Sequence, residues 1–307
     1  MIEVGIIGSG DWALALTKIL TNVKIIIKAR KLDGLKEKFL DKNKEILLTT
    51  NFIDLSSCKF LFLANPSQTV RENLKKIPKK ISFKFVICCK GVEKDSNKLM
   101  HQVLQDLFPK SGYAVLSGPN FAAEVIKGLP TASVLSSKSN KILNEVSSII
   151  SHKKFRTYFN NDIIGTQIGG AMKNVIAIAS GVIIGSNLGH NATAAIITRG
   201  LSEIIDLGIQ MGAKKTTFYG LSGIGDLTLT CSSLKSRNTK LGYLLAKGKH
   251  RTNQLFEGLE SCESICKLGK KFSLELPICN AVKKILNGSD INKIVTDLLS
   301  RPLQFEK

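Results

Sequence analysis

The sequence lacks a long uninterrupted apolar run and has few aromatic residues, and both shortages restrict its class of function. Its longest apolar stretch, residues 174–189, contains asparagine and serine, and a membrane crossing needs about 20 apolar residues. We therefore expect no integral membrane segment. Aromatic side chains make up 6% of the residues and do not alternate with basic ones, which disfavours a surface for nucleic acid.

The chain also lacks the sequence features of secretion and of disorder. Residues 1–7 contain no basic group of the kind that begins a signal peptide, and no cleavage site follows them. There is no low-complexity tract, and 43% of the 307 residues are apolar, which is enough to form buried cores. We expect a globular cytoplasmic protein with roughly two domains.

No C-x-x-C pair occurs among the seven cysteines. Cys262 and Cys266 lie one helical turn apart, but no second pair or histidine cluster completes a zinc site. The odd number of cysteines and these spacings favour reduced thiols in a reducing cytosol. We expect no metal site.

The formal net charge is +20, from 44 basic and 24 acidic residues. The excess is spread out, since residues 1–160 hold 26 basic and 13 acidic side chains and residues 161–307 hold 18 and 11. No block of five or six like charges marks a tail for nucleic acid. The charge therefore indicates a lysine-rich surface that attracts anionic ligands as a by-product, and we expect no nucleic-acid partner.

Residues 1–160 predict an α/β fold, a Rossmann-type doubly wound sheet. Short apolar runs alternate with helical stretches, which is typical of βαβ units and a mostly parallel sheet. The first helix is expected at Asp11–Leu20. The expected strands are Ile2–Ile7, Val23–Ala29, Phe60–Ala64, Phe83–Cys89, Tyr113–Leu116 and Thr131–Leu135.

Residues 161–307 predict a second, all-α domain. Residues 163–184 are nearly all apolar or small, so we expect a buried central helix there. Further helices are expected at Thr193–Met211, Asn253–Leu268 and Pro277–Leu286, the last beginning at a proline. Almost no strand signal follows residue 162.

A glycine-rich turn follows the first expected strand and opens the first helix. Gly8-Ser9-Gly10-Asp11-Trp12-Ala13 has the form G-x-G-x-x-A, an accepted variant of the dinucleotide fingerprint. Gly8 permits the tight turn, Gly10 allows a pyrophosphate to approach the backbone, and the helix N-terminus attracts its charge. The alternative is an ordinary turn between strand and helix.

The second expected strand ends in a basic sequence, Lys28-Ala29-Arg30. Sites that prefer NAD usually place an acidic residue there, which binds the ribose 2′-hydroxyl. Arg30 can instead pair with a 2′-phosphate and stack on the adenine. This favours NADPH as the cofactor, with NAD possible, against the alternative of a surface arginine.

Further short motifs follow the glycine turn along the chain. They are Asn65-Pro66-Ser67-Gln68, Cys89-Lys90-Gly91, Ser117-Gly118-Pro119-Asn120-Phe121-Ala122-Ala123-Glu124, Gly169-Gly170-Ala171-Met172-Lys173-Asn174-Val175-Ile176-Ala177, Gly223-Ile224-Gly225-Asp226-Leu227, Ser236-Arg237-Asn238, Phe256-Glu257-Gly258 and Ser300-Arg301-Pro302. Each motif is a weak signal alone, but their order is highly specific. In these motifs the sequence resembles the bacterial NAD(P)-dependent glycerol-3-phosphate dehydrogenases, nearly from end to end.

The resemblance implies a Rossmann domain followed by a helical substrate domain, and homodimers are common in the family. It also implies reversible hydride transfer between NAD(P)H and dihydroxyacetone phosphate, giving sn-glycerol 3-phosphate for glycerophospholipid synthesis in the cytoplasm. Ketone reduction needs an acid as well as a hydride. Lys173 lies in an otherwise apolar helix, where burial lowers the pKa of a lysine toward the range that suits proton exchange. The resemblance makes it the catalytic acid/base; the alternative is a structural lysine whose ammonium reaches solvent.

The resemblance also assigns the other site residues. Asn174 and Asp226 would orient the substrate or Lys173, although a Gly-Asp sequence alone is more often just a turn. The predicted substrate-binding residues are Lys90, Gly118, Asn120, Lys173, Asn174, Asp226, Ser236, Arg237 and Asn238, the last three gripping the phosphate. The predicted cofactor-binding residues are Gly8, Ser9, Gly10, Asp11, Trp12, Arg30, Lys90, Ala122, Arg237, Leu255 and Glu257.

Four features depart from the family pattern, one of which is Ala13-Leu14 in place of the usual Gly-Thr. Asp11 replaces serine or alanine and puts a negative charge near the expected pyrophosphate, which is unfavourable unless it caps the helix or points away. Asn120 replaces threonine or serine, and the segment between Leu241 and Glu257 is short. Two other hypotheses stay open: a related Rossmann-plus-helical hydroxy-acid dehydrogenase, and a binding protein for nucleic acid or an acidic membrane surface.

Overall fold

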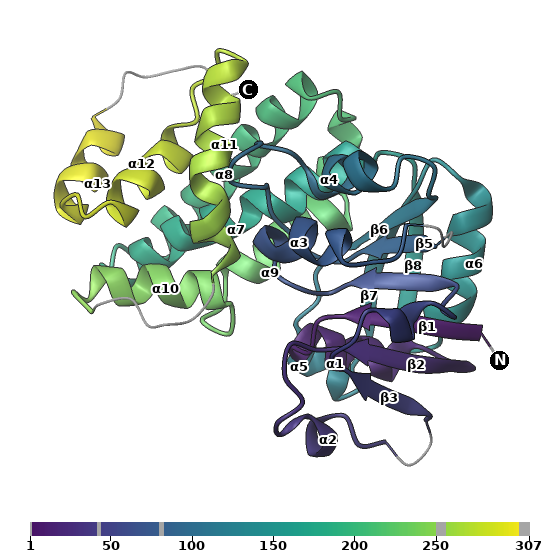
Figure 1. Ribbon diagram of the computed structural model, residues 1–307. Helices are drawn as coiled ribbons and strands as arrows, with labels where there is room; N and C mark the ends of the chain where they lie inside the picture. Colours follow the sequence, from purple (N-terminus) through teal and green to yellow (C-terminus); the bar gives the residue numbers. More distant parts are fainter. Residues whose placement is uncertain (1, 42–43, 80–82, 250–255, 301–307) are drawn as a thin grey trace. The chain divides into compact units, whose positions relative to one another are not determined.

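The computed structural model describes residues 2–41, 44–79, 83–249 and 256–300 (Figure 1). Its contacts divide the chain into two compact units. The first contains the residues up to Lys90 together with Leu99–Ile163, and the second contains Gly91–Lys98 together with the residues from Ile164 onward. The short segment Gly91–Lys98 therefore belongs with the second half of the chain, which no local sequence pattern indicates.

The first unit is built on one eight-stranded sheet with the strand order β3-β2-β1-β4-β5-β6-β7-β8. Neighbouring strands are parallel except β6 and β7, which are antiparallel. The order reverses direction beside β1, the position where doubly wound sheets bind ligands. The strands are β1 (Ile2–Ile7), β2 (Val23–Lys28), β3 (Ile46–Thr49), β4 (Phe60–Leu63), β5 (Lys84–Ile87), β6 (Tyr113–Ser117), β7 (Thr131–Ser136) and β8 (Phe155–Asn160).

Helices cover both faces of this sheet, as the predicted doubly wound fold requires. Alternate strand residues point to opposite faces, so the sheet has two separate apolar clusters. One cluster includes residues of α1 and α6, and the other includes residues of α3 and α4. The α-helices are α1 (Asp11–Ile19), α2 (Leu35–Lys38), α3 (Val70–Lys75), α4 (Met100–Leu107), α5 (Ala122–Ile126) and α6 (Asn140–Ile150).

Two strands, β3 and β8, are absent from the sequence-based prediction. They form the two edges of the sheet, where one side of the strand has no neighbour. Each carries exposed or half-buried side chains instead of a continuous apolar run; β8 holds an exposed Arg156 between Phe155 and Thr157. An edge strand that is only partly covered gives a weak hydrophobic pattern, which explains why the run-based prediction missed both.

The second unit is built from helices, as predicted. Its long central helix, α7, matches the expected buried helix, and α12 has the predicted bounds. The most apolar 18-residue window of α7 could cross a membrane by length and composition, but 94% of that window is buried inside the protein. The helices are α7 (Ile163–Gly185), α8 (Gly189–Gln210), α9 (Asp226–Cys231), α10 (Arg237–Ala246), α11 (Glu257–Lys271), α12 (Pro277–Leu286) and α13 (Ile291–Leu299).

Helices α7 and α10 touch backbone to backbone at glycines. A Cβ atom added at Gly181 of α7 would lie 1.9 Å from the carbonyl oxygen of Thr239, and one added at Gly242 of α10 would lie 1.9 Å from the carbonyl oxygen of Ile178. Neither obstacle is a flexible side chain, so both positions require glycine. The two helices thus cross with their backbones in contact, and this contact fixes α10 against α7, the helix that carries Lys173.

Candidate active site

The glycine turn after β1 has the shape that a pyrophosphate needs. Gly8 has φ +121°, and a Cβ there would lie 2.7 Å from the carbonyl oxygen of Ala64. Gly10 has an ordinary extended backbone, with φ −75°, and a Cβ there would meet nothing within 4 Å. The helix α1 begins at the next residue, and the first N–H groups of a helix have no partner within the helix. With Ser9 between them, the two glycines form a cradle that fits a dinucleotide pyrophosphate.

The negative charge of Asp11 was expected to be unfavourable beside a pyrophosphate, but its side chain does not point into this cradle. Its side chain is 79% exposed, and Lys38 Nζ lies 3.0 Å from its Oδ1 atom. No side chain caps α1, whose first turn starts at Asp11. The carboxylate is thus directed to a surface lysine. The next residue, Trp12, packs against the core of the first unit.

The end of β2 presents basic groups. Arg30 is exposed just beyond the strand. Lys28 Nζ lies 4.0 Å from the centre of the Phe52 ring, a cation–π contact. Partial burial lowers the pKa of Lys28, and the positive charge of Lys76 lowers it further. No acidic residue occupies residues 28–31.

Lys90 and Asn120 are held at the ends of neighbouring strands. Lys90 Nζ, beyond β5, donates a hydrogen bond to the carbonyl oxygen of Gly118, beyond β6, at 3.1 Å. Asn120 Nδ2 donates to the carbonyl oxygen of Ala132 at 3.0 Å, and its Oδ1 accepts from Ser133 Oγ at 2.8 Å. The amide of Asn120 therefore anchors this loop to β7. Two residues later, at Ala122, the helix α5 begins.

In the second unit, Lys173 and Asp226 form a buried ion pair. Lys173 Nζ on α7 lies 2.6 Å from Asp226 Oδ1, at the first residue of α9. It also donates to Thr230 Oγ1 at 2.7 Å. The residues Lys173 and Asp226 are 8% and 1% exposed, so both charges have left bulk water. A buried charge is costly unless it is paired, and here the two charges pair with each other.

Thr230 connects the ion pair to the backbone of α9 and to a side chain of α10. Its Oγ1 donates to the carbonyl oxygen of Asp226 at 2.6 Å while it accepts from Lys173. Its own carbonyl oxygen accepts from Thr239 Oγ1 on α10 at 2.7 Å. Thr230 is not among the residues predicted from the sequence. A signal existed, because it stands four residues after Asp226 and so lies on the same face of α9.

A second set of hydrogen bonds joins α7, α10 and α11. Asn238 Nδ2 donates to Asn174 Oδ1 at 3.0 Å, and Asn238 Oδ1 accepts from the backbone N–H of Gly258 at 3.1 Å. A Cβ at Gly258 would lie 2.4 Å from the carbonyl oxygen of Asn174, so the helices approach closely here too. Glu257, the first residue of α11, is thereby fixed next to the helix pair that carries Lys173 and Asn238.

The motif Ser236-Arg237-Asn238 opens α10. Ser236 is its N-cap, and the Ser236 side chain accepts from the N–H of Thr239 at 3.3 Å. Arg237 is exposed at the first helical position, while Ser236 and Asn238 are buried. A guanidinium at the N-terminus of a ten-residue helix suits a phosphate, because the positive end of the helix and the arginine attract the same anion.

Comparison with known proteins identifies the family. The model described as the NAD-dependent glycerol-3-phosphate dehydrogenase N-terminus matches residues 3–143, and the model of its C-terminus matches residues 162–296. A glycerol-3-phosphate dehydrogenase from Zymomonas mobilis is 37% identical over 322 residues, covering 99% of this chain and 94% of its own. The chain belongs to the NAD-dependent glycerol-3-phosphate dehydrogenase family.

Other members of this family are similar over their whole length. The glycerol-3-phosphate dehydrogenase of Fusobacterium nucleatum is 36% identical over 331 residues, covering 100% of this chain and 99% of its own. A crystal structure of glycerol-3-phosphate dehydrogenase from Coxiella burnetii has a TM-score of 0.90 at 30% identity, covering 98% of this chain and 99% of the other. The resemblance inferred from the sequence motifs is thus confirmed, as is the predicted fold class.

The structure brings the predicted residues of this family member into two groups. In the first unit, the glycine turn, Arg30, Lys90, Gly118, Asn120 and Ala122 lie at or just beyond strand ends. In the second unit, Lys173 and Asn174 lie in the middle of α7, whereas Asp226, Ser236, Arg237, Asn238 and Glu257 lie at the starts of α9, α10 and α11. The predicted contact of Leu255 lies outside the described residues, as does most of Ser300-Arg301-Pro302. Their roles in binding stay predictions.

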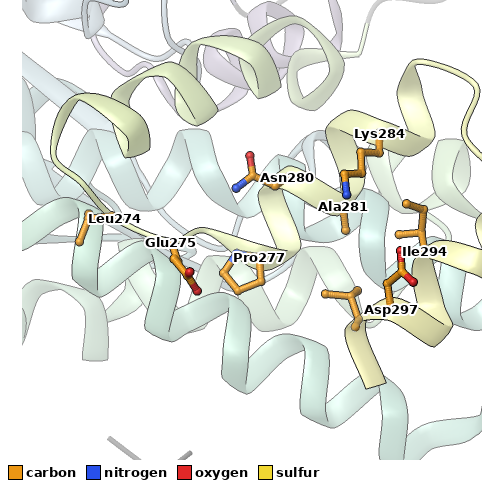
Figure 2. A pocket seen from close by; sticks show the side chains of 9 residues that line it. Leu274, Glu275, Pro277, Asn280, Ala281, Lys284, Ile294 and Asp297 are labelled. Carbon is orange, nitrogen blue, oxygen red and sulfur yellow. The ribbon is translucent and has the colours of Figure 1, made fainter. Parts of the chain in front are cut away.

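A cavity of about 270 Å³ lies elsewhere in the second unit of the enzyme, beside α12 and α13 (Figure 2). Carboxylates of Glu275 and Asp297 and the Lys284 ammonium stand among apolar side chains around it. It shares no residue with the predicted site.

Proposed function

We propose that the chain interconverts dihydroxyacetone phosphate and sn-glycerol 3-phosphate with NADPH or NADH as the redox partner. The product would supply glycerophospholipid synthesis. The observation that carries the proposal is the buried Lys173–Asp226–Thr230 cluster beside a helix that opens with Ser236-Arg237-Asn238. A proton donor and an anion grip on helices packed backbone to backbone are what reduction of a phosphorylated ketone requires.

In this reaction the protein provides the proton. When bound, the reduced nicotinamide supplies the hydride to the ketone carbon. The ammonium of Lys173 gives a proton to the ketone oxygen, and in the reverse direction the neutral amine takes it back. Asp226 and Thr230 hold the Lys173 ammonium in place by two short hydrogen bonds. Asp226 and Thr230 are therefore positioning residues for the Lys173 ammonium.

The substrate phosphate would be held at the start of α10. Arg237 donates from its planar guanidinium, and the helix N-terminus adds its N–H groups. The amide of Asn238 already spans Asn174 and Gly258. A phosphate bound there would contact Asn238, which is hydrogen-bonded to the helices that carry Lys173 and Glu257. These hydrogen bonds align the ketone with the Lys173 ammonium for proton transfer.

For the cofactor we propose NADPH in preference to NADH. The basic end of β2, with Arg30 exposed and Lys28 over the Phe52 ring, suits a 2′-phosphate. The Gly8–Gly10 cradle holds the pyrophosphate. Lys90, Gly118, Asn120 and Ala122 would face the nicotinamide and the substrate from the ends of β5 and β6. We further propose a cytoplasmic homodimer.

The proposal is tested by following cofactor oxidation at 340 nm with dihydroxyacetone phosphate. We expect turnover with NADPH faster than with NADH, and a loss of at least about a hundredfold in kcat for Lys173→Met, the usual size of an acid–base contribution. Lys271→Met, at an exposed lysine of α11, is the matched control and should keep wild-type rates. Full activity in Lys173→Met would transfer the acid role to another group.

A second arm of the test uses dihydroxyacetone without its phosphate. Arg237→Leu should lower kcat/KM for the phosphorylated ketone by about ten- to a hundredfold, since a charge-assisted contact contributes about 1.5–3 kcal/mol. For unphosphorylated dihydroxyacetone, the variant and the wild type should be equal. An equal loss for both substrates would show that Arg237 does not grip the phosphate.

A further inference from the structure

One buried polar atom beside the glycine turn has no partner among the described residues: the Oδ1 atom of Asn65. Asn65 follows β4, the strand that pairs with β1 on the side opposite β2. The residue is only 6% exposed. A buried amide oxygen without a hydrogen bond costs about 1–3 kcal/mol, and such a group in a folded protein calls for a functional explanation.

The orientation of this amide follows from its neighbours. Thr69 Oγ1 donates its single hydrogen to the carbonyl oxygen of Pro66 at 2.8 Å, so toward Asn65 it can only accept. Asn65 Nδ2 donates to Thr69 Oγ1 at 2.8 Å and lies 3.3 Å from the same Pro66 carbonyl oxygen. Both neighbouring oxygens, Thr69 Oγ1 and the Pro66 carbonyl oxygen, act as acceptors toward Asn65. The Nδ2 group of Asn65 must therefore face them, and Oδ1 points away from them.

A ligand at this position must consequently be a hydrogen-bond donor. Asn65 Nδ2 is occupied by Thr69 and Pro66, which leaves Oδ1 as the group with free capacity. Phosphate and carbonyl oxygens can only accept, so they do not match it. A hydroxyl group does. This separates Asn65 from the glycine cradle, whose N–H groups suit the pyrophosphate.

The sheet topology says which hydroxyl this is. The backbone nitrogen of Asn65 lies 2.9 Å from where a Gly8 Cβ would be, so the residue adjoins the cradle. In a doubly wound sheet a dinucleotide lies across the reversal point, with its adenosine half over the β2 side and its other half over the β4 side. Asn65 stands on the β4 side of β1.

We propose that Asn65 binds the cofactor by accepting a hydrogen bond from a hydroxyl of the nicotinamide ribose. The inference rests on the dinucleotide binding of the proposed function, and on no step of its chemistry. Asn65 is then a binding residue that turns the nicotinamide half of the cofactor to a fixed angle, while Thr69 keeps the amide oriented.

Binding is measured by calorimetry and by the fluorescence of Trp12, the single tryptophan, which stands in the glycine turn. The ligands are NADPH and 2′,5′-ADP, which has the phosphorylated adenosine half but no nicotinamide ribose. We expect Asn65→Leu and Asn65→Ala to raise the Kd for NADPH about tenfold, the loss of one hydrogen bond to a buried acceptor. The Kd for 2′,5′-ADP should change less than about twofold, because neither the cradle nor β2 is altered.

Thr69→Val removes the hydroxyl that orients the amide and leaves Asn65 Oδ1 in place. Because the amide can then turn, it should raise the Kd for NADPH, by no more than Asn65→Leu does, and leave the Kd for 2′,5′-ADP within about twofold. Equal losses for NADPH and 2′,5′-ADP, an unchanged Kd in both Asn65 variants, or a Thr69→Val loss larger than that of Asn65→Leu would each overturn the proposal. Because binding alone is read, the result stands apart from whether dihydroxyacetone phosphate is turned over.

A cofactor analogue separates the ribose from the nicotinamide carboxamide, whose NH2 group is also a donor. The 3-acetylpyridine analogue of NADP keeps the ribose and lacks that NH2 group. The tenfold effect of Asn65→Leu should persist with this analogue. Its disappearance would assign the Asn65 contact to the carboxamide and overturn the assignment to the ribose.

Discussion

Substitution of Gly10 by alanine separates cofactor binding from folding. The backbone of Gly10, with φ −75°, is one that alanine adopts freely, and the added methyl group would meet nothing within 4 Å. Alanine reduces the entropy of the unfolded chain, which stabilises by about 0.4–1 kcal/mol, and it is a slightly poorer N-cap than glycine. We therefore expect the free energy of unfolding to stay within about 1 kcal/mol of the wild type.

The same methyl group occupies the space over which the pyrophosphate would lie. Loss of two charge-assisted hydrogen bonds at about 1.5–3 kcal/mol each predicts a Kd for NADPH at least about a hundredfold higher. Gly8→Ala is the contrasting variant, because its φ of +121° and the Ala64 carbonyl oxygen 2.7 Å away exclude a Cβ. Gly8→Ala should lower Tm by several degrees, at about 2–4 °C per kcal/mol for a protein of this size.

The assay pairs thermal unfolding with calorimetric titration of NADPH for the wild type and both variants. Wild-type stability with lost binding in Gly10→Ala supports the cradle. Wild-type affinity in Gly10→Ala would refute the reasoning, because it would show that the pyrophosphate does not approach this backbone. A large loss of stability in Gly10→Ala would contradict the open space found around the residue.

Two more predictions concern packing and thiol chemistry. Gly242→Ala places a methyl group 1.9 Å from the carbonyl oxygen of Ile178, and we expect it to destabilise by at least about 4 kcal/mol in urea unfolding; an unchanged midpoint would mean that α10 can move off α7. Burial raises the pKa of Cys58 and of Cys231 to about 12, so at pH 8 both are neutral thiols, and Cys89, which is half-buried, should account for the fast reaction with Ellman's reagent. A fast phase that survives Cys89→Ser would contradict this.

Much of the fold was predictable because its central elements are strongly patterned. The four residues of β4 are fully buried, and such a strand appears in the sequence as a continuous apolar run. The edge strands β3 and β8 were not predictable in this way, since half-buried edges carry mixed residues. Assignment of Gly91–Lys98 to the second unit depends on long-range contacts, such as the hydrogen bond from the Val92 N–H to Ser261 Oγ.

The candidate site was predictable where a residue type is unusual for its surroundings. A lysine in an apolar helix needs a partner, and the structure provides Asp226. The links from Asn238 to Asn174 and Gly258 cross 64 and 20 positions of the sequence. No local pattern encodes such pairings. Asn65 belongs to a recognised motif, yet its unsatisfied oxygen becomes visible only when every neighbouring donor has been placed.

The glycine crossing of α7 and α10 has a consequence for how this enzyme can change. Where side chains separate two helices, a larger or smaller residue alters their spacing, and selection can tune the distance between two functional groups in small steps. At Gly181 and Gly242 the backbones themselves are in contact, so no smaller residue remains and every larger one collides. Substitutions at these two glycines therefore cannot change the distance from Lys173 to the start of α10 in small steps. A descendant that accepts a longer phosphorylated ketone would have to find its extra room in a loop rather than between these helices.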